Sequence, residues 1–437
     1  MKFIKLVGLF GLISISFSGA YAQCPWTQEE LNDFKVRPHT NFSRKGLWEK
    51  KLIVRAQMEK AFEEGSFDKD CSVIARDYFF SIRDKEDYLD EEQYRKKGVA
   101  VLDHSFEDSS YLRVTPKTAS RNLYQELKSG DVILSRGKAY TSAAISNLGE
   151  FDTQFSHLSL VYQDELGKFW TIEAHIEVGS FVRELEDHVA DKNARTVVFR
   201  FKDPEIAHEA AKKMFNKVKT AFDTKGPINY DFGFDKKDSS ELFCSEIISL
   251  GFELATNKEL DVPLYESAIL RRKPKIVRQL GLKAENSFIP ADIEVDPRFE
   301  LISEWKNPAI LADILQKDAV LRTLFKLSDE EGHVLKQAST GTSLLYRNVA
   351  WPLRRVPFLK KYFVDKLPLN MSREMIGYFG VLETIGKILQ TELQKAENTA
   401  LQNEDRLLTA QEKWAILDNF RKSDSKRAKK FRKSFRP

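Results

Sequence analysis

The sequence contains little cysteine: only Cys24, Cys71 and Cys244 occur among its 437 residues. In an oxidising compartment Cys24 and Cys71 can pair, since both lie in one predicted helical region, and Cys244 would then remain a free thiol. A thiol that stays unpaired in an oxidising compartment calls for a functional explanation. Cys244 is therefore a candidate for chemistry.

Long hydrophobic runs are also scarce. The apolar run at residues 6–17 is shorter than the about 20 residues that a membrane span requires. It follows a positively charged start and precedes Ala-Tyr-Ala at residues 20–22, which is the pattern of a cleaved signal peptide. We therefore predict that residues 1–22 are removed and that the protein is exported, to the periplasm or outside the cell. Lipid anchoring at Cys24 is less expected, because Gln23 stands where a lipoprotein signal has a small residue.

The chain as a whole lacks a strong excess of charge of one sign, since its formal net charge is only +4. Its length and its 42% hydrophobic residues suit two or three globular domains. The charge is unevenly placed: residues 421–437 contain nine Lys or Arg and one Asp, a net of +8, which leaves −4 for the rest. We expect this basic tail to be a solvated end or to contact an anionic surface such as lipid headgroups or wall polymers. Nucleic acid is not an expected partner of an exported protein.

Helical patterns dominate both ends of the chain, and neither an internal repeat nor a glycine-rich phosphate loop occurs. We predict a helical N-terminal region at residues 23–120 and a helical C-terminal region at residues 306–420. Within the latter, residues 346–363 alternate aromatic and basic side chains, which suits a membrane interface or a helix pair packed on the body of the protein. The predicted helix starts are Thr27 with Glu30, Asn307, Ser372, and Thr409 with Glu412.

Residues 121–305 change to short apolar segments typical of strands. A helix follows them, with Asp203 as its cap and Pro204 at its first position. Strands in succession, with helices before and after them, predict an α+β fold. The predicted strands are residues 131–135, 157–163, 168–174, 179–185 and 195–201.

Cys244 lies where a further helix is predicted to begin. The N-cap types Asp238, Ser239 and Ser240 precede it, and the apolar residues Ile247, Ile248, Leu250 and Phe252 follow as a buried stripe. At a helix start the free N–H groups and the helix dipole favour a thiolate, so we predict a thiol pKa below its usual value of about 8.5. The alternative interpretation is a small buried hydrophobic residue.

The hairpin predicted around residues 164–168 supplies a candidate catalytic base for Cys244, which is His157. If its loop has three residues with Gly167 in the left-handed conformation, His157 lies opposite His175 and diagonal to Glu173 on one face. A slip of one residue would move the set to the other face. With Cys244, this arrangement predicts a Cys-His-Glu triad, although His175 could replace Glu173 as its third member. No clustered ligand set indicates a metal, and no cofactor is expected.

Five short segments occur in order at residues 130–134, 155–161, 172–174, 229–232 and 243–246. In this order they resemble the motifs of the circularly permuted NlpC-type papain-like cysteine hydrolases, and most of all those of the YiiX-like branch, which is related to the lecithin:retinol acyltransferase group. The segment at residues 290–305 resembles the part that closes such domains. The resemblance covers about residues 120–305 and implies a permuted papain-like domain at 121–305, an antiparallel meander plus a nucleophile helix, with helical extensions on both sides.

The resemblance also implies roles for individual residues. Cys244 would be the nucleophile, His157 the base and then the acid, and Glu173 the group that orients His157. Tyr230 would line the site or assist an oxyanion hole, and Asp131 would be a turn or capping residue. The further candidates for substrate binding are Ser156, Ser245 and His175.

The predicted activity is that of an exported cysteine peptidase or amidase that cleaves an amide bond, in cell-wall peptide. One alternative keeps the nucleophile but changes the substrate to a lipid amide or ester, or makes the protein an acyltransferase. A second alternative is a catalytically idle scaffold that binds the wall or a membrane.

Overall fold

The computed structural model describes residues 24–97, 112–115, 126–150, 152–190, 193–236, 238–269, 274–337, 340–354, 356 and 370–437. The predicted signal peptide at residues 1–22 and most of the aromatic and basic stretch beyond residue 354 lie outside these ranges. Within them, no helix combines the length and the apolar character needed to cross a membrane.

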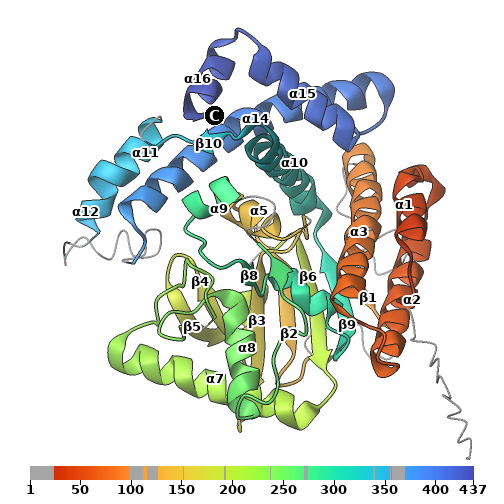
Figure 1. Cartoon of the computed structure of the whole chain (residues 1–437), viewed down its shortest axis with the longest axis vertical. Helices are drawn as coiled ribbons and strands as arrows, with labels where there is room; N and C mark the ends of the chain where they lie inside the picture. Colours follow the sequence, from red (N-terminus) through yellow and green to blue (C-terminus); the bar gives the residue numbers. More distant parts are fainter. Residues whose placement is uncertain are drawn as a thin grey trace, which may run out of the picture.

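A seven-stranded antiparallel sheet lies at the centre of the molecule, in the order β1-β9-β6-β2-β3-β4-β5 (Figure 1). All five predicted strands are present, each within one residue of its predicted bounds. Two strands of this sheet were not predicted. β1 lies inside the region expected to be helical, and β9 contains the charged residues Glu304 and Lys306, which interrupt its apolar pattern. The strands are β1 (Leu112–Val114), β2 (Val132–Arg136), β3 (His157–Gln163), β4 (Phe169–His175), β5 (Gly179–Glu184), β6 (Arg195–Phe201) and β9 (Phe299–Lys306).

Two helices cover one face of this sheet, as Figure 1 shows. They are α7 (Pro204–Lys225) and α8 (Cys244–Ala255). Asp203 caps α7 by accepting hydrogen bonds from the backbone N–H groups of Glu205 and Ile206, as the sequence predicts. Shorter elements complete this part: α5 (Tyr140–Ser146), α6 (Leu185–Ala190), β7 (Ser267–Ala268), α9 (Pro274–Gln279), β8 (Asn286–Ser287) and η2 (Pro290–Val295).

The N-terminal helices form a separate small core beside β9. They are α1 (Gln28–Val36), α2 (Arg44–Glu63) and α3 (Lys69–Lys97), with the short turn η1 (His39–Asn41) between the first two. The predicted capping box of Thr27 and Glu30 begins α1. A disulfide joins Cys24 to Cys71, whose Cα atoms are 5.5 Å apart, so the predicted pairing is present and Cys244 is the free cysteine.

A buried network of ion pairs joins α3 to the sheet. The Lys306 ammonium lies 3.2–3.3 Å from carboxylate oxygens of α3, and the Lys51 ammonium bridges α3 to Glu304 of β9. Burial alone would lower the pKa of Lys306, but the surrounding carboxylates raise it above its usual value, so the ammonium stays charged. The network pairs the acidic residues Glu86, Asp87, Asp90 and Glu304 with the basic residues Arg44, Lys51, Arg195 and Lys306.

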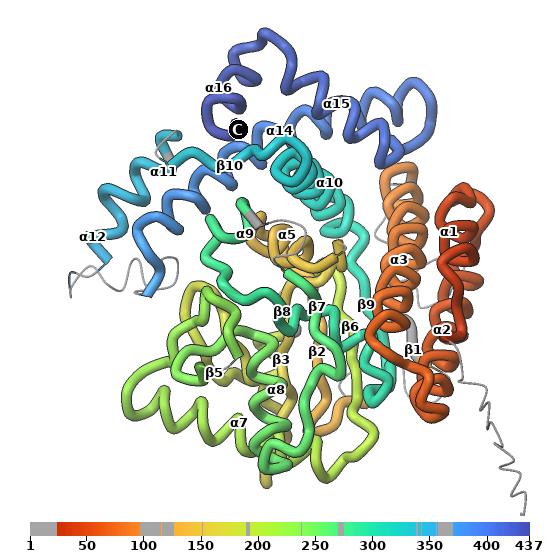
Figure 2. Tube along the Cα trace, viewed as in Figure 1, coloured from red at the N-terminus to blue at the C-terminus, as the bar shows by residue number. Residues whose placement is uncertain are grey.

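The C-terminal helices lie across one end of the sheet, and α5 is between α10 and the strands (Figure 2). Asn307, Ser372 and Thr409 cap α10, α14 and α15, as predicted. The elements are α10 (Pro308–Glu331), β10 (Val334–Leu335), α11 (Gly341–Leu345), η3 (Tyr346–Ala350), α12 (Trp351–Leu353), α14 (Arg373–Glu404), α15 (Ala410–Lys422), α16 (Lys426–Ser434) and β11 (Phe435–Arg436).

The basic tail is folded, and the expectation of a solvated end is wrong. Ala428, Phe431 and Phe435 are buried against the neighbouring helices, and β11 pairs with β10. These apolar residues recur at helical spacing among the basic ones, so α16 buries one face while the other keeps its charges in water. The prediction of a solvated end relied on the number of basic residues and did not take account of this apolar face.

Replacing Lys306 with Met tests the buried network. The substitution leaves carboxylates buried without their cation, so we expect it to lower the free energy of unfolding by about 3–5 kcal/mol. Urea denaturation monitored by circular dichroism measures the change. The matched control is Lys387→Met, because Lys387 makes an exposed i,i+4 pair with Glu383 that contributes about 0.5 kcal/mol at most. Equal, small effects of the two substitutions would contradict the importance of the network.

Candidate active site

The β3–β4 hairpin has the register that the sequence predicts. Gln163 pairs with Phe169, the Asp164 N–H donates to the Lys168 carbonyl, and Gly167 adopts a φ of 80° in the three-residue loop. His157 and His175 therefore meet across the hairpin, with their rings edge to face and their centroids 4.7 Å apart. The loop length thus fixes which side chains share the site face.

The carboxylate of Glu173 is the centre of the hydrogen-bond network of the site. It is fully buried on β4, and its oxygens have more hydrogen-bonding neighbours than the roughly four lone-pair positions of a carboxylate. Both histidines of the hairpin place Nε2 2.9 Å from the same oxygen, Oε2. Three neighbours bind Oε1: Thr171 Oγ1 at 2.7 Å, Arg183 Nε at 2.7 Å and His188 Nδ1 at 3.0 Å. The Nη2 of Arg183 also donates to Oε2, at 3.2 Å.

Burial acts on the pKa values of Glu173 and His157 in opposite directions, because it disfavours the charged form of each side chain. For Glu173 it opposes ionisation, but the charge of His188 and the hydrogen bonds from His157, His175 and His188 outweigh it and hold the pKa well below its usual value. For His157 burial is the stronger effect and lowers the pKa to about 4, although Glu173 acts to raise it. His157 is therefore a neutral imidazole at neutral pH. Because its Nε2–H donates to Glu173, the unprotonated nitrogen is Nδ1.

Cys244 is the first residue of α8, as predicted, but the cap differs from the prediction. The N-cap is Phe243, with no side-chain hydrogen bond to the helix. The Asp238 carboxylate instead accepts from the N–H of Ser240, and the chain then pairs with residues 229–231 before the helix begins. Of the predicted stripe, Ile247, Ile248 and Phe252 are buried, and Leu250 is half-buried.

The predicted low pKa of the Cys244 thiol is wrong. The side chain is 97% covered, and burial raises the thiol pKa. Backbone N–H groups of Leu158, Ser245 and Cys244 itself act in the other direction but do not outweigh burial. The helix start was a correct observation. The sequence could not show how much water the fold would exclude from the sulfur.

Cys244 and His157 line one cavity of about 150 Å³. Tyr230 and His175 line it as well, and burial raises the pKa of Tyr230 well above its usual value, so its hydroxyl stays protonated as a donor. The cavity wall also includes residues of α5, among them Thr141 and Ser142. The fold thus brings together side chains separated by about a hundred residues in the sequence.

The remaining predicted residues have different positions. Ser156 lines the cavity, and its hydroxyl accepts from the Gly137 N–H at 3.1 Å. Ser245 is fully buried beside Cys244, with its Oγ 4.0 Å from the sulfur, and is not part of the cavity wall. Asp131 is a structural residue, since its carboxylate accepts from the Lys128 N–H and from the Arg200 guanidinium.

Sequence reasoning missed two members of the site, Arg183 and His188. Arg183 lies on β5 opposite Thr171, so two-residue alternation could have placed it on the face of Glu173 once the β4–β5 pairing was known. His188 reaches Glu173 from α6, and no periodic pattern in the sequence marks it.

Three site residues could hold a metal ion, which the sequence did not indicate. His157, Glu173 and His175 each offer one ligand atom, and these atoms lie within 4.8 Å of one another. Imidazole and carboxylate are ordinary zinc ligands. The Arg183 guanidinium, 2.7 Å from Glu173, opposes a second cation at the same place by charge repulsion. A metal bound at His157 Nε2 would also replace the hydrogen bond from that nitrogen to Glu173.

The similarity of this chain to known proteins is distant. No family model matches the chain, and no curated protein matches it. Among solved structures, the chain is similar to the crystal structure of metalloprotein yiiX from Escherichia coli O157:H7, with 19% identity over 40% of this chain and 96% of that chain. The TM-score is 0.31, and a likeness of this size carries no argument about the site.

The raised thiol pKa predicts slow alkylation of native Cys244. With Cys24 and Cys71 in a disulfide, iodoacetamide labelling under non-reducing conditions reports on Cys244 alone. We expect the native thiol to react more slowly at pH 7 than the urea-unfolded thiol, and its rate to rise at a higher pH than that of the unfolded thiol. The Cys244→Ser chain serves as the blank. Rapid native labelling near pH 6 would show instead a preformed thiolate.

Proposed function

We propose that the protein is an exported cysteine hydrolase that cleaves an amide bond, through a triad of Cys244, His157 and Glu173. The observation that carries this proposal is that the free thiol and the histidine bound to Glu173 line the same cavity. The three residues match the order and roles of the permuted papain-like hydrolases that the sequence resembles. We extend the proposal to a permuted papain-like domain for residues 121–305.

The charge states favour activation of the thiol during the attack rather than before it. The thiol and the His157 imidazole are both neutral at pH 7. As the sulfur bonds to the substrate carbonyl carbon, Nδ1 of His157 takes the thiol proton, and the imidazolium is stabilised by the Glu173 carboxylate. His157 then gives this proton to the departing amine as the C–N bond breaks, which leaves an acyl-enzyme.

Hydrolysis of the acyl-enzyme uses the same residues in reverse. His157 takes a proton from water, the resulting hydroxide attacks the thioester carbon, and the C–S bond breaks as Cys244 regains its proton. The first N–H groups of α8 have no acceptor within the helix, and those of Cys244 and Ser245 already point toward the sulfur. They would stabilise the oxyanion formed in both steps.

The size and lining of the cavity support a peptide rather than a lipid substrate. Its volume of about 150 Å³ suits one amino-acid-sized acyl group better than a long acyl chain. Its wall is rich in polar side chains such as Arg183, Asn193 and Ser142. With the predicted export, these features favour cell-wall peptide as the substrate.

Mass spectrometry of the purified protein with peptidoglycan fragments tests the proposal. We expect amide cleavage, an acyl adduct on Cys244, and a fall in kcat of roughly 10²–10⁴-fold for His157→Ala, the range for loss of a general base. His208→Ala is the matched control, because His208 is an exposed histidine of α7 outside the cavity. The acidic limb of the rate profile should lie near pH 4, where the base form of His157 is lost.

Three results would contradict the proposal. Cleavage of phospholipids in place of peptide would transfer the chemistry to a lipid substrate. Loss of activity with a chelator and its return with zinc would favour the metal arrangement of His157, Glu173 and His175. Unchanged cleavage rates in Cys244→Ala would show that Cys244 is not the nucleophile.

A further inference from the structure

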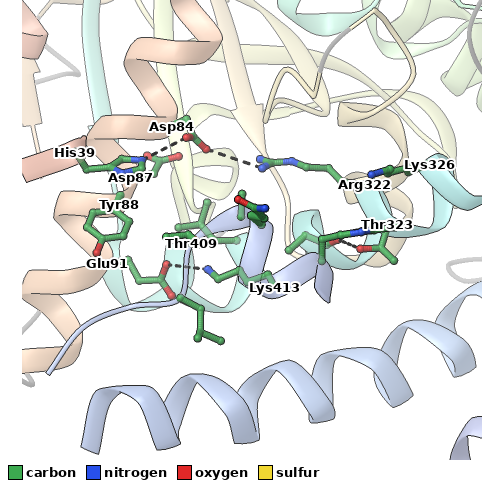
Figure 3. Close-up of a pocket in the computed structure, with 16 residues that line it drawn as sticks. His39, Asp84, Asp87, Tyr88, Glu91, Arg322, Thr323, Lys326, Thr409 and Lys413 are labelled. Atoms are coloured by element: carbon green, nitrogen blue, oxygen red, sulfur yellow. Dashed lines mark hydrogen bonds and ion pairs between the residues drawn. The ribbon is translucent and has the colours of Figure 1, made fainter. Parts of the chain in front are cut away.

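A second cavity lies where the N-terminal and C-terminal helices meet, far in the sequence from Cys244. It has a volume of about 400 Å³ and is enclosed by α3, α10 and the start of α15 (Figure 3). It shares no wall residue with the Cys244 cavity. The proposed hydrolase activity therefore does not account for it.

The wall formed by α3 is acidic. Asp84, Asp87 and Glu91 face the cavity, because their spacing of three and four residues places them on one side of the helix. Asp87 is 1% exposed, and its Oδ1 binds Arg195 and Lys306, whereas its Oδ2 has no hydrogen-bond partner among the described residues. Glu91 is likewise buried; its Oε1 accepts from Arg95 at 2.9 Å, and the Lys413 ammonium lies 3.9 Å from its Oε2. This wall can receive a positively charged group.

The opposite wall is basic. Arg322 and Lys326 are four residues apart on α10, and Lys413 extends from α15. The Nε of Arg322 already donates to Asp152 at 2.5 Å, so a ligand would meet its remaining N–H groups. The Lys326 ammonium is exposed and lies 4.0 Å from the centre of the Trp414 ring; within the described ranges, no carboxylate lies within ion-pair distance of it. This wall can receive a carboxylate.

The two walls face each other without close contact. Arg322 is 3.9 Å from Asp84, and Lys413 is 3.9 Å from Glu91, both drawn as dashed lines in Figure 3. A charge-assisted hydrogen bond measures about 2.7–2.9 Å, so neither pair makes one. Charged groups of a ligand could therefore form shorter bonds to each wall than the walls form with one another.

Apolar surface lies between the charges. Tyr88, stacked on His39 with ring centroids 4.3 Å apart, and Leu315 and Trp414 contribute to the lining. The volume falls within the range of about 300–1,000 Å³ that small-molecule sites occupy. An anion without a positive group would be repelled by the acidic wall, and a cation without a negative group would be repelled by the basic wall. An uncharged ligand would remove water from both walls without replacing its hydrogen bonds.

We propose that this cavity binds a short peptide with free amino and carboxyl ends. The ammonium would bind Asp84 and Glu91, the carboxylate would bind Arg322 and Lys326, and an apolar side chain would pack against Tyr88 and Trp414. This binding function is separate from the proposed hydrolase activity and does not depend on it.

Calorimetric titration with three probes tests the proposal: the dipeptide Ala-Leu, its N-acetylated form and its C-amidated form. The full-length Cys244→Ala chain is used so that no cleavage of the probe contributes heat. We expect the free dipeptide to bind, and each blocked form to bind at least about tenfold more weakly, because each loses a charge-assisted bond. Equal binding of the three probes, or no binding of the free dipeptide at millimolar concentration, would overturn the proposal.

A substitution on the exposed part of the wall locates the site. Lys326→Gln should weaken binding of free Ala-Leu and leave the C-amidated form unchanged, since the two changes remove the same interaction. Lys387→Gln, an exposed lysine of α14 outside the cavity, is the matched control and should change neither. If Lys326→Gln and Lys387→Gln behave alike, the peptide binds elsewhere and the proposal is wrong.

Discussion

Buried charges at the junction of α3 with β6 and β9 hold the parts of this protein together. Burying ions is expensive, so such a junction is stable only where each charge has close partners. Lys306 and Lys51 meet this condition by lying among carboxylates from both sides. Lys306 ends β9 just before α10 begins, so the same residue fixes where the N-terminal helices stand relative to the C-terminal ones. The cavity between α3, α10 and α15 follows from that placement.

The Cys244 site uses the same principle on a smaller scale. Glu173 is a buried anion whose hydrogen-bond donors come from β3, β4, β5 and α6, so one carboxylate orients side chains from four elements. Burial also sets the resting charge state, with a neutral thiol and a neutral imidazole. A site of this kind would develop charge only when a substrate is present, which keeps the buried sulfur unreactive in its absence.

Local rules predicted most of the elements and much of the site. Short apolar segments identified the five strands, and capping residues identified the starts of α1, α7, α10, α14 and α15. The prediction was wrong where charge and burial combine. β9 was missed because Glu304 and Lys306 are buried ions within a strand. The folded basic tail was missed because basic residues stand next to Phe431 and Phe435 in the sequence. Such residues have the appearance of surface positions until their partners are known.

The sequence by itself determined the register of the hairpin, because the length of the loop at Gly167 fixes which residues face each other, and so it placed His157, His175 and Glu173 together. It also placed Cys244 in or near the first turn of α8, although Phe243, and none of the predicted cap residues, is the N-cap. Only the tertiary structure decided the protonation of the thiol, the entry of Arg183 and His188 into the site, and the presence of the second cavity. These properties depend on which distant segments exclude water from a given atom, and hydrogen bonds and burial between distant segments leave no periodic trace in the chain.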